Sequence, residues 1–176
     1  VFAVVLILLA IAITLVPETV THTPRTYRPQ RIAVPAAAKS AFVAAGFAAF
    51  AGFALFGLFT SLAPSILVGT FEVTDHLIAG MTVFLVFGSA AAAQIALARM
   101  PRRGQLLFAA ASAGVGLIAV AAGALLPSLA LFLVGGVISG AGVGALFKNA
   151  LAVAGEVAEP GRRGETLAGI FLVAYC

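Results

Sequence analysis

The fold is decided by the stretch Arg99-Met100-Pro101-Arg102-Arg103-Gly104, which lies between two long apolar runs at residues 77–98 and 106–126. Each run is long enough to cross a hydrocarbon core of about 30 Å as an α-helix. Arginines concentrated in a loop between two such spans orient that loop toward the cytoplasm. We therefore expect two antiparallel transmembrane helices joined by a cytoplasmic loop at residues 99–105.

The composition supports the same interpretation. Hydrophobic residues make up 62% of the chain and charged residues only 9%, and the mean hydropathy is +1.18. Such a chain has too few polar residues to cover a soluble globule, which predicts a multi-pass protein embedded in the lipid bilayer. The net charge of +4 does not indicate a nucleic-acid partner, because nine of the ten basic residues fall in three short loops between spans. That distribution is typical of loops that orient membrane spans.

The order of apolar and polar segments predicts an all-α, polytopic transmembrane helical bundle. We interpret residues 1–16 as the end of a cut transmembrane helix. Residues 17–39 are expected to form a linker rich in proline and arginine, and residues 40–176 a transmembrane bundle. The spans of the bundle are expected at about residues 41–70, 77–98, 106–126, 129–154 and 167–176, the last one truncated. We therefore expect the sequence to be a fragment of a longer protein.

The first span of the bundle is longer than a bilayer requires, since its helix would extend about 43 Å. Pro64 lies near its outer end, where proline removes a backbone hydrogen bond and favours a kink. The hydroxyl groups of Thr60, Ser61 and Ser65 are close enough in sequence to satisfy the carbonyls that this leaves free. We expect a bent outer end.

The loops alternate between two faces of the membrane. Loops 17–39, 99–105 and 155–166 share one face, and loops 71–76 and 126–128 share the other. All basic residues in these loops lie on the first face, which predicts that it is the cytoplasmic side of the cell membrane. They are Arg25, Arg28, Arg31, Lys39, Arg99, Arg102, Arg103, Arg162 and Arg163.

Lys148 and Asn149 are polar residues inside the fourth complete span of the bundle. They lie some six residues before its cytoplasmic end, about 9–10 Å deep along the helix axis. A lysine at this depth extends toward the headgroups or pairs with a structural partner, or it has a role with substrate, proton or gate. Both alternatives stay open from the sequence, and Glu156 is a partner only if the helix continues that far.

Phe47, Phe50, Phe53, Phe56 and Phe59 recur at every third residue of the first long span. On a helix with 3.6 residues per turn, each step of three slips by about 60°, so the five rings wind around about 240° of the helix surface. They cannot all face one site. We expect one or two of them to line an apolar pocket.

Gly136, Gly140 and Gly144 form two overlapping GxxxG units in the fourth span. The four-residue spacing places them on one face of a helix, where they allow the backbone of another helix to come close. The motif predicts tight helix packing, and a smooth glycine face also permits small sliding or rocking movements.

The sequence contains no constellation typical of an enzyme. It has no HExxH, GxSxG or GxxxxGK motif, and its single cysteine, Cys176, has no partner for a disulfide or a metal site. We therefore expect no enzymatic activity, no cofactor and no metal ion.

Residues 94–103, QIALARMPRR, resemble a degraded copy of the cytoplasmic motif Gly-x-Leu-Ala-Asp-Arg-x-Gly-Arg-Arg of the major facilitator superfamily (MFS). Arg99, Arg102 and Arg103 match this motif, whereas Ala98 stands where the motif has aspartate. The linker at 17–39 is similar to the connection between the sixth and seventh helices of that family. Residues 160–169 are similar to the loop that enters its eleventh helix.

The resemblance implies the C-terminal half of a twelve-helix transporter, from the end of helix six to the start of helix eleven. Its two halves rock around a site at the midplane, usually under a proton gradient. It implies a small organic substrate, most similar to those of efflux members, and an N-terminal half of the same chain as partner. Candidate cavity residues are Thr60, Ser61, Lys148 and Asn149, and the arginines at 99, 102, 103, 162 and 163 are candidates for the gating loops. A channel or a non-catalytic membrane scaffold is the alternative.

Overall fold

A computed structural model describes residues 2–17, 34, 36–159 and 161–175. The chain divides into two units, residues 1–30 and residues 31–176. In the first unit, α1 (Phe2–Leu15) is a single apolar helix whose residues 3–15 are exposed. The expected linker lies largely outside the described residues, and so do Arg25, Arg28 and Arg31.

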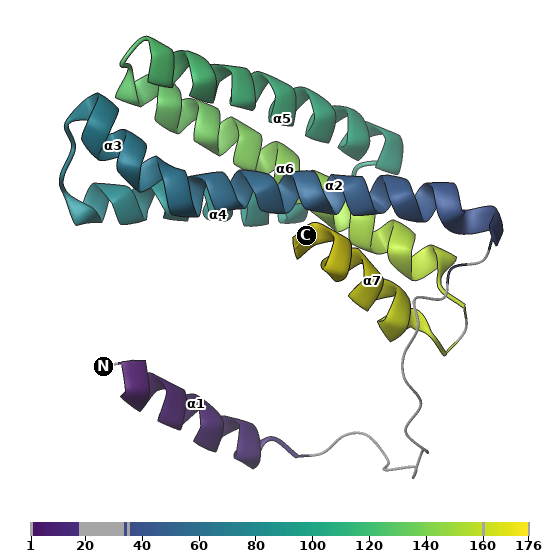
Figure 1. Cartoon of the computed structure of the whole chain (residues 1–176). Coiled ribbons are helices and arrows are strands. Elements are labelled where there is room, and N and C mark those ends of the chain that lie inside the picture. Colours follow the sequence, from purple (N-terminus) through teal and green to yellow (C-terminus); the bar gives the residue numbers. More distant parts are fainter. Residues whose placement is uncertain (1, 18–33, 35, 160, 176) are drawn as a thin grey trace. The chain divides into compact units, whose positions relative to one another are not determined.

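All regular secondary structure in the described part of the second unit is helical, and no strand occurs there. Its elements are η1 (Ala36–Ala38), α2 (Lys39–Gly57), η2 (Leu58–Leu62), α3 (Ala63–Phe71), α4 (His76–Ala96), α5 (Arg102–Leu125), α6 (Leu129–Val157) and α7 (Arg163–Tyr175), as Figure 1 shows. Four stretches are long and apolar enough to cross a membrane: Lys39–Phe71, α4, α5 and α6. The prediction of an all-α, polytopic helical bundle is confirmed.

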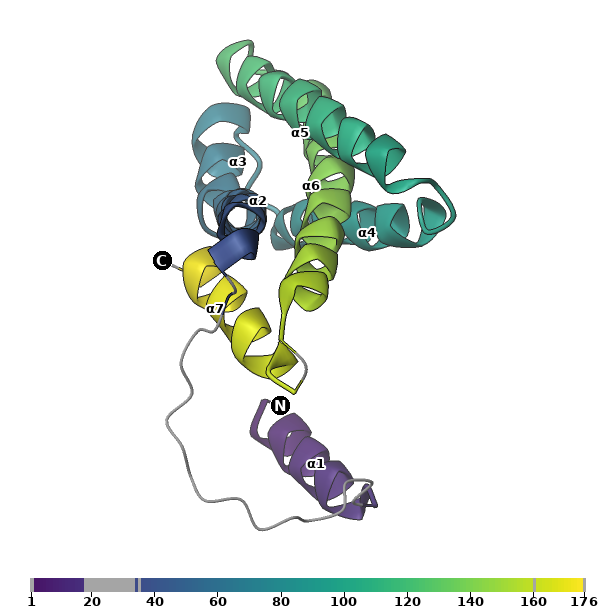
Figure 2. The same cartoon turned by 90° about the vertical axis from the view of Figure 1, so that its right-hand side faces the viewer.

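Helix α6 is the centre of this bundle. Half of its most apolar stretch is buried, whereas the corresponding share is a third or less in the other three spans. It packs against α5, α4 and α2, which surround it in Figures 1 and 2. The outer faces of the surrounding helices carry exposed large apolar residues such as Phe84, Leu107 and Ile118. These faces are suited to lipid contact.

Glycines on two sides of α6 explain how the helices come this close. On one side, a Cβ at Gly140 would lie 2.5 Å from the carbonyl oxygen of Val86, and one at Gly144 would meet the carbonyl oxygen of Ala90. On the other side, a Cβ at Gly135 would lie 2.5 Å from the amide nitrogen of Val120. Gly142 faces α5 in the same way. Backbones therefore pack directly on one another at both interfaces.

The long first span is interrupted one turn before its proline. Between α2 and α3, the segment η2 is a π-helix, in which the amide of Ala63 donates to the carbonyl of Leu58. Pro64 then lies in the first turn of α3, and Figure 1 shows α3 inclined to α2. Proline has no N–H to donate to the carbonyl four residues before it, so the series of α-helical hydrogen bonds is already broken at this point. The π turn, which contains one extra residue, changes the hydrogen-bond spacing at the same place.

The two ends of the bundle are defined by contacts between helices. Arg102 at the start of α5 pairs with Glu156 near the end of α6 at 2.7 Å. This pair brings together the loops before α5 and after α6, which contain most of the described arginines. At the opposite end, the rings of Phe71 and Phe132 lie 5.4 Å apart and hold the end of α3 against the start of α6. We call the end that contains the Arg102–Glu156 pair the basic end.

Candidate functional site

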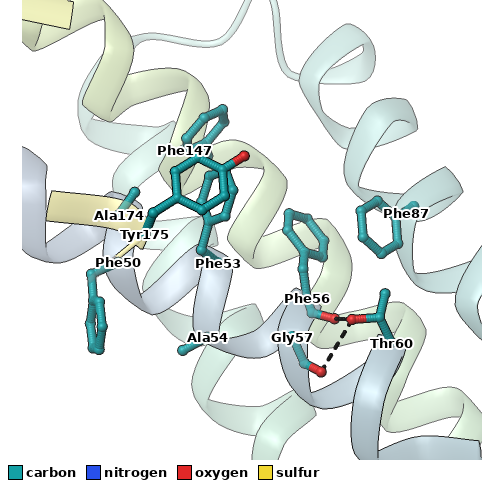
Figure 3. Close-up of a pocket in the computed structure, with 10 residues that line it drawn as sticks. All are labelled: Phe50, Phe53, Ala54, Phe56, Gly57, Thr60, Phe87, Phe147, Ala174 and Tyr175. Atoms are coloured by element: carbon teal, nitrogen blue, oxygen red, sulfur yellow. Dashed lines mark hydrogen bonds between the residues drawn. The ribbon is translucent and has the colours of Figure 1, made fainter. Parts of the chain in front are cut away.

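A cavity of about 570 Å³ lies between α2, α4, α6 and α7, with one lining residue, Thr60, from η2 (Figure 3). Six of its ten lining residues are aromatic. The lining residues are Phe50, Phe53, Ala54, Phe56, Gly57, Thr60, Phe87, Phe147, Ala174 and Tyr175. We call it the aromatic cavity.

Phe53 is the centre of a group of rings from three helices on one side of this cavity. Its ring centroid lies 4.5 Å from that of Tyr175 on α7 and 5.6 Å from that of Phe147 on α6, both in edge-to-face geometry. Phe171 completes the group at 6.4 Å from Phe53. Edge-to-face contact places the positive edge of one ring against the negative face of the next, which holds the rings in a definite arrangement.

A second pair of rings lies apart from this group in Figure 3. Phe56 on α2 and Phe87 on α4 are stacked, with centroids 4.3 Å apart and planes inclined by 22°. Because they come from different helices, the stack also joins α2 to α4.

The five phenylalanines at three-residue spacing therefore have different environments. Phe50, Phe53 and Phe56 line the aromatic cavity, Phe47 is 69% exposed, and Phe59 is fully buried in the core against Phe132. The expectation that one or two would line a pocket was too low. Three consecutive members span only about 120° of the helix surface, which is compatible with one cavity wall.

The candidate residues Thr60 and Ser61 differ in position. Thr60 lines the cavity, and its hydroxyl donates to the carbonyls of Phe56 at 2.9 Å and Gly57 at 3.2 Å. Ser61 is exposed outside the cavity lining, and its hydroxyl donates to Gly57. Both hydroxyls therefore serve the carbonyls beside the π-helical segment. The lining of the aromatic cavity is therefore mainly apolar.

Lys148 and Asn149 lie at the basic end, and the aromatic cavity does not include them. The ammonium group of Lys148 donates to the backbone carbonyl of Gln94 at 2.9 Å, in the last turn of α4. Helix α6 does continue past Glu156, but Glu156 pairs with Arg102. Lys148 thus caps the end of a neighbouring helix.

Asn149 belongs to a chain of amide hydrogen bonds. Its Nδ2 donates to Oε1 of Gln105 at 3.1 Å and to the carbonyl of Ala145, and Nε2 of Gln105 donates to the carbonyl of Met100 at 2.8 Å. Asn149 and Gln105 are both buried. Sequence reasoning missed Gln105, although a glutamine three residues into an apolar helix was an available signal.

Asn149 also lines a smaller cavity of about 270 Å³ between α2, α5 and α6. Arg102 lies at this cavity, and alanines of α2 form one of its walls. Of the four candidate cavity residues, Thr60 and Asn149 therefore lie at different cavities. Lys148 and Ser61 line neither of them.

The arginines of the two described basic loops differ in their contacts. Arg162 pairs with Glu165 at 2.6 Å and with Glu159 at 3.5 Å. The hydrogen bond to Glu165 raises the pKa of Arg162 above its ordinary value. Arg163 donates to the carbonyl of Gly155 at 3.0 Å.

The matching arginines of the first basic loop are freer. Arg99 and Arg103 are exposed, and the side chain of neither takes part in a hydrogen bond or ion pair with any residue that the structure describes. Arg102 is the one arginine of the motif that joins α5 to α6. Within the described ranges, no three His, Cys, Asp or Glu residues lie close enough together to hold a metal ion.

Three membrane-spanning helices packed against a fourth, α6, define a multi-pass membrane protein, and a cavity of about 570 Å³ lies between three of these spans and α7. The family model of the Major Facilitator Superfamily matches residues 1–176, and the chain belongs to this family. It is thus part of a membrane transporter, in a family whose members move solutes. Searches of curated proteins and of solved structures each found no match.

Proposed function

We propose that the chain is part of a secondary active transporter that exports a small organic molecule across the cytoplasmic membrane by rocking between two states. The observation that carries this proposal is the aromatic cavity. Its volume of about 570 Å³ falls within the range of small-molecule sites, about 300–1,000 Å³. Four helices and η2 contribute to its lining, so movement of one helix against another changes the shape of the site.

The packing of α6 supports rocking as the movement. Its glycines bring the backbones of α4 and α5 into direct contact with the backbone of α6, which favours movement of these three helices as one body. In this proposal the second wall of the substrate site comes from an N-terminal half of the same protein. The two bodies then expose the site alternately to the two sides of the membrane.

The distribution of charge supports an orientation with the basic end in the cytoplasm. Arg99, Arg102 and Arg103 lie at this end with Arg162 and Arg163, and the loops of the opposite end contain no lysine or arginine. By the positive-inside rule, the basic end faces the cytoplasm. A proton entering from the opposite side is the proposed coupling ion.

The test uses cells that express the full-length protein carrying this chain. Exporting cells are expected to accumulate less of at least one member of a panel of fluorescent dyes than cells with an empty vector. An uncoupler that collapses the proton gradient is expected to abolish the difference. A difference that persists without the gradient contradicts proton coupling, and flux that does not saturate with dye concentration indicates a channel. Equal accumulation of every dye contradicts the transporter proposal.

A further inference from the structure

We infer that the aromatic cavity selects planar aromatic solutes that carry no negative charge. This inference rests on the proposed function, since it names the substrate class of the same site. The supporting observation is that six of the ten lining residues are aromatic, contributed by α2, α4, α6 and α7.

The arrangement of the rings suits a flat ligand. In Figure 3 the rings of Phe53, Phe147 and Tyr175 lie together, apart from the stacked pair of Phe56 and Phe87, and both sets line the cavity. A planar aromatic solute between them meets ring edges on one side and the stacked pair on the other. Each added aromatic pair strengthens binding roughly 2- to 10-fold beyond the burial of area alone. A saturated solute of the same volume gains only the burial.

The polar groups of the lining discriminate against anions. The Thr60 hydroxyl donates its hydrogen to backbone carbonyls, so it is not available as a donor to a ligand. No lysine, arginine or histidine lines the cavity, and the ammonium group of Lys148 is bound to the carbonyl of Gln94. An anion held against this wall therefore loses its hydration without gaining a positive partner from the wall. A cation meets the negative faces of the rings, which attract it.

Tyr175 supplies the one polar contact at the rim. Its side chain is 74% exposed, and its hydroxyl has no hydrogen-bond partner among the described residues. A phenolic hydroxyl both donates and accepts. It is placed to bind a polar group at the edge of an aromatic solute, which favours amphipathic ligands over pure hydrocarbons.

The experiment measures binding of three probes to the purified full-length protein by isothermal titration calorimetry. The probes are trimethyl-2-naphthylammonium, its saturated decahydronaphthyl counterpart, and naphthalene-2-sulfonate. We expect the aromatic cation to bind at least 10-fold more tightly than the saturated cation, and the sulfonate to bind most weakly. Equal binding of the aromatic and saturated cations, preferential binding of the sulfonate, or no binding of any probe overturns the inference.

Variants connect this preference to the cavity. Phe53→Leu and Phe56→Leu are each expected to reduce the aromatic preference about 3- to 10-fold, whereas Phe53→Tyr keeps the ring and preserves it. Phe108→Leu on α5 is the control, because α5 contributes no residue to this cavity. An unchanged preference in the two leucine variants overturns the assignment to this site. If they fail to fold, Phe50→Leu at the 44% exposed rim provides the same comparison.

The failure of this inference is distinguishable from failure of the proposed function. Uncoupler-sensitive export of any dye in cells supports the transporter, whichever probe binds best. A transporter that exports dyes and binds saturated or anionic probes equally well retains its proposed function and loses this substrate class.

Discussion

At the scale of single residues, the glycines of α6 are the positions at which the structure leaves least room. A Cβ at Gly144 would meet the backbone of Ala90, which cannot move aside as a flexible side chain can. Gly114 on α5 provides the contrast, because no atom lies within 4 Å of a Cβ placed there. The two positions differ in packing and share a helical backbone.

We therefore expect Gly144→Ala to destabilise the protein by roughly 1–3 kcal/mol, the usual cost of overpacking. Gly114→Ala is expected to leave the free energy of unfolding unchanged or to raise it by up to about 1 kcal/mol, because alanine favours the helix more than glycine does. The measurement is reversible unfolding of the full-length protein in mixed micelles. Equal effects of the two substitutions contradict direct backbone packing between α6 and α4.

The buried pair of Asn149 and Gln105 leads to a second prediction. Their amide groups lie 3.1 Å apart across the α5–α6 interface. A double-mutant cycle with Asn149→Ala and Gln105→Ala is expected to give a coupling energy of about 0.6 kcal/mol, and no more than about 1.7 kcal/mol, as for other interhelical hydrogen bonds in membranes.

A matched cycle provides the control for this pair. It combines Asn149→Ala with Ser89→Ala, whose hydroxyl bonds within its own helix to Val86. This cycle is expected to give no coupling. Coupling in the control and none in the Asn149–Gln105 cycle would contradict the amide chain.

These residues also show where sequence reasoning stopped. The positions of Lys148 and Asn149 inside a span followed from hydropathy, but their partners did not. The partner of Lys148 is the backbone carbonyl of Gln94. Because every residue has a backbone carbonyl, no sequence pattern indicates which one a lysine will bind. The partner of Asn149 depends on how α5 is rotated against α6, which is determined by glycines on both helices.

At the scale of elements, the interruption of the first span combines three local causes. The π-helical segment Leu58–Leu62 precedes Pro64, and the hydroxyls of Thr60 and Ser61 bind carbonyls in the turn before it. A kink near Pro64 was predictable, because proline removes a specific hydrogen bond. The π-helical hydrogen bonding was not predictable, since it depends on which carbonyl each backbone amide donates to.

Replacing Pro64 by alanine restores an N–H that can donate to Thr60 and continue the α-helical ladder. We expect Pro64→Ala to straighten this span and lengthen the distance between spin labels at Val43 and Val68, two exposed positions on either side of the interruption. Pulsed electron paramagnetic resonance measures this distance. Pro101→Ala, outside the span at the N-cap of α5, is the control.

Because the straightened span alters one wall of the aromatic cavity, transport by the Pro64→Ala variant is also expected to fall. An unchanged spin-label distance would instead show that the hydroxyls of Thr60 and Ser61 maintain the π segment without the proline.

The spans themselves were the most predictable elements. Long apolar runs separated by Pro127-Ser128 or by the arginines at 99–103 leave little choice about where spans lie. Their ends were less predictable, because α5 begins at Arg102, inside the expected loop 99–105, and α6 continues to Val157. Burial was less predictable, since α6 has nearly the same hydropathy as its neighbours. Its central position follows from small residues on two faces, and only one of these faces was visible as a GxxxG motif.

At the scale of the whole molecule, the two ends of the bundle differ in charge. The described arginines of the two basic loops lie at the basic end, which the ion pair of Arg102 and Glu156 holds together. The opposite end has acidic residues, and Asp75 caps α4 there by accepting a hydrogen bond from the amide of Leu77 at 2.7 Å.

Cysteine labelling tests the orientation that this distribution predicts. In full-length protein made cysteine-free, with Cys176→Ser, a membrane-impermeant maleimide is expected to label Thr74→Cys and Ser128→Cys in intact cells. Met100→Cys, exposed at the basic end, is expected to react only after the cells are permeabilised. Labelling of Met100→Cys in intact cells would place the basic end outside, against the positive-inside rule.

The closeness of α5 and α6 has a consequence for how the protein is made. Only residues 126–128 separate the two helices, and Gly116, Gly123, Gly135 and Gly142 bring their backbones together along their length. Contacts between segments so near in sequence form quickly, because little chain entropy is lost in closing a short loop. During insertion into the membrane, we therefore expect α5 and α6 to assemble as a hairpin before α7 packs against α6.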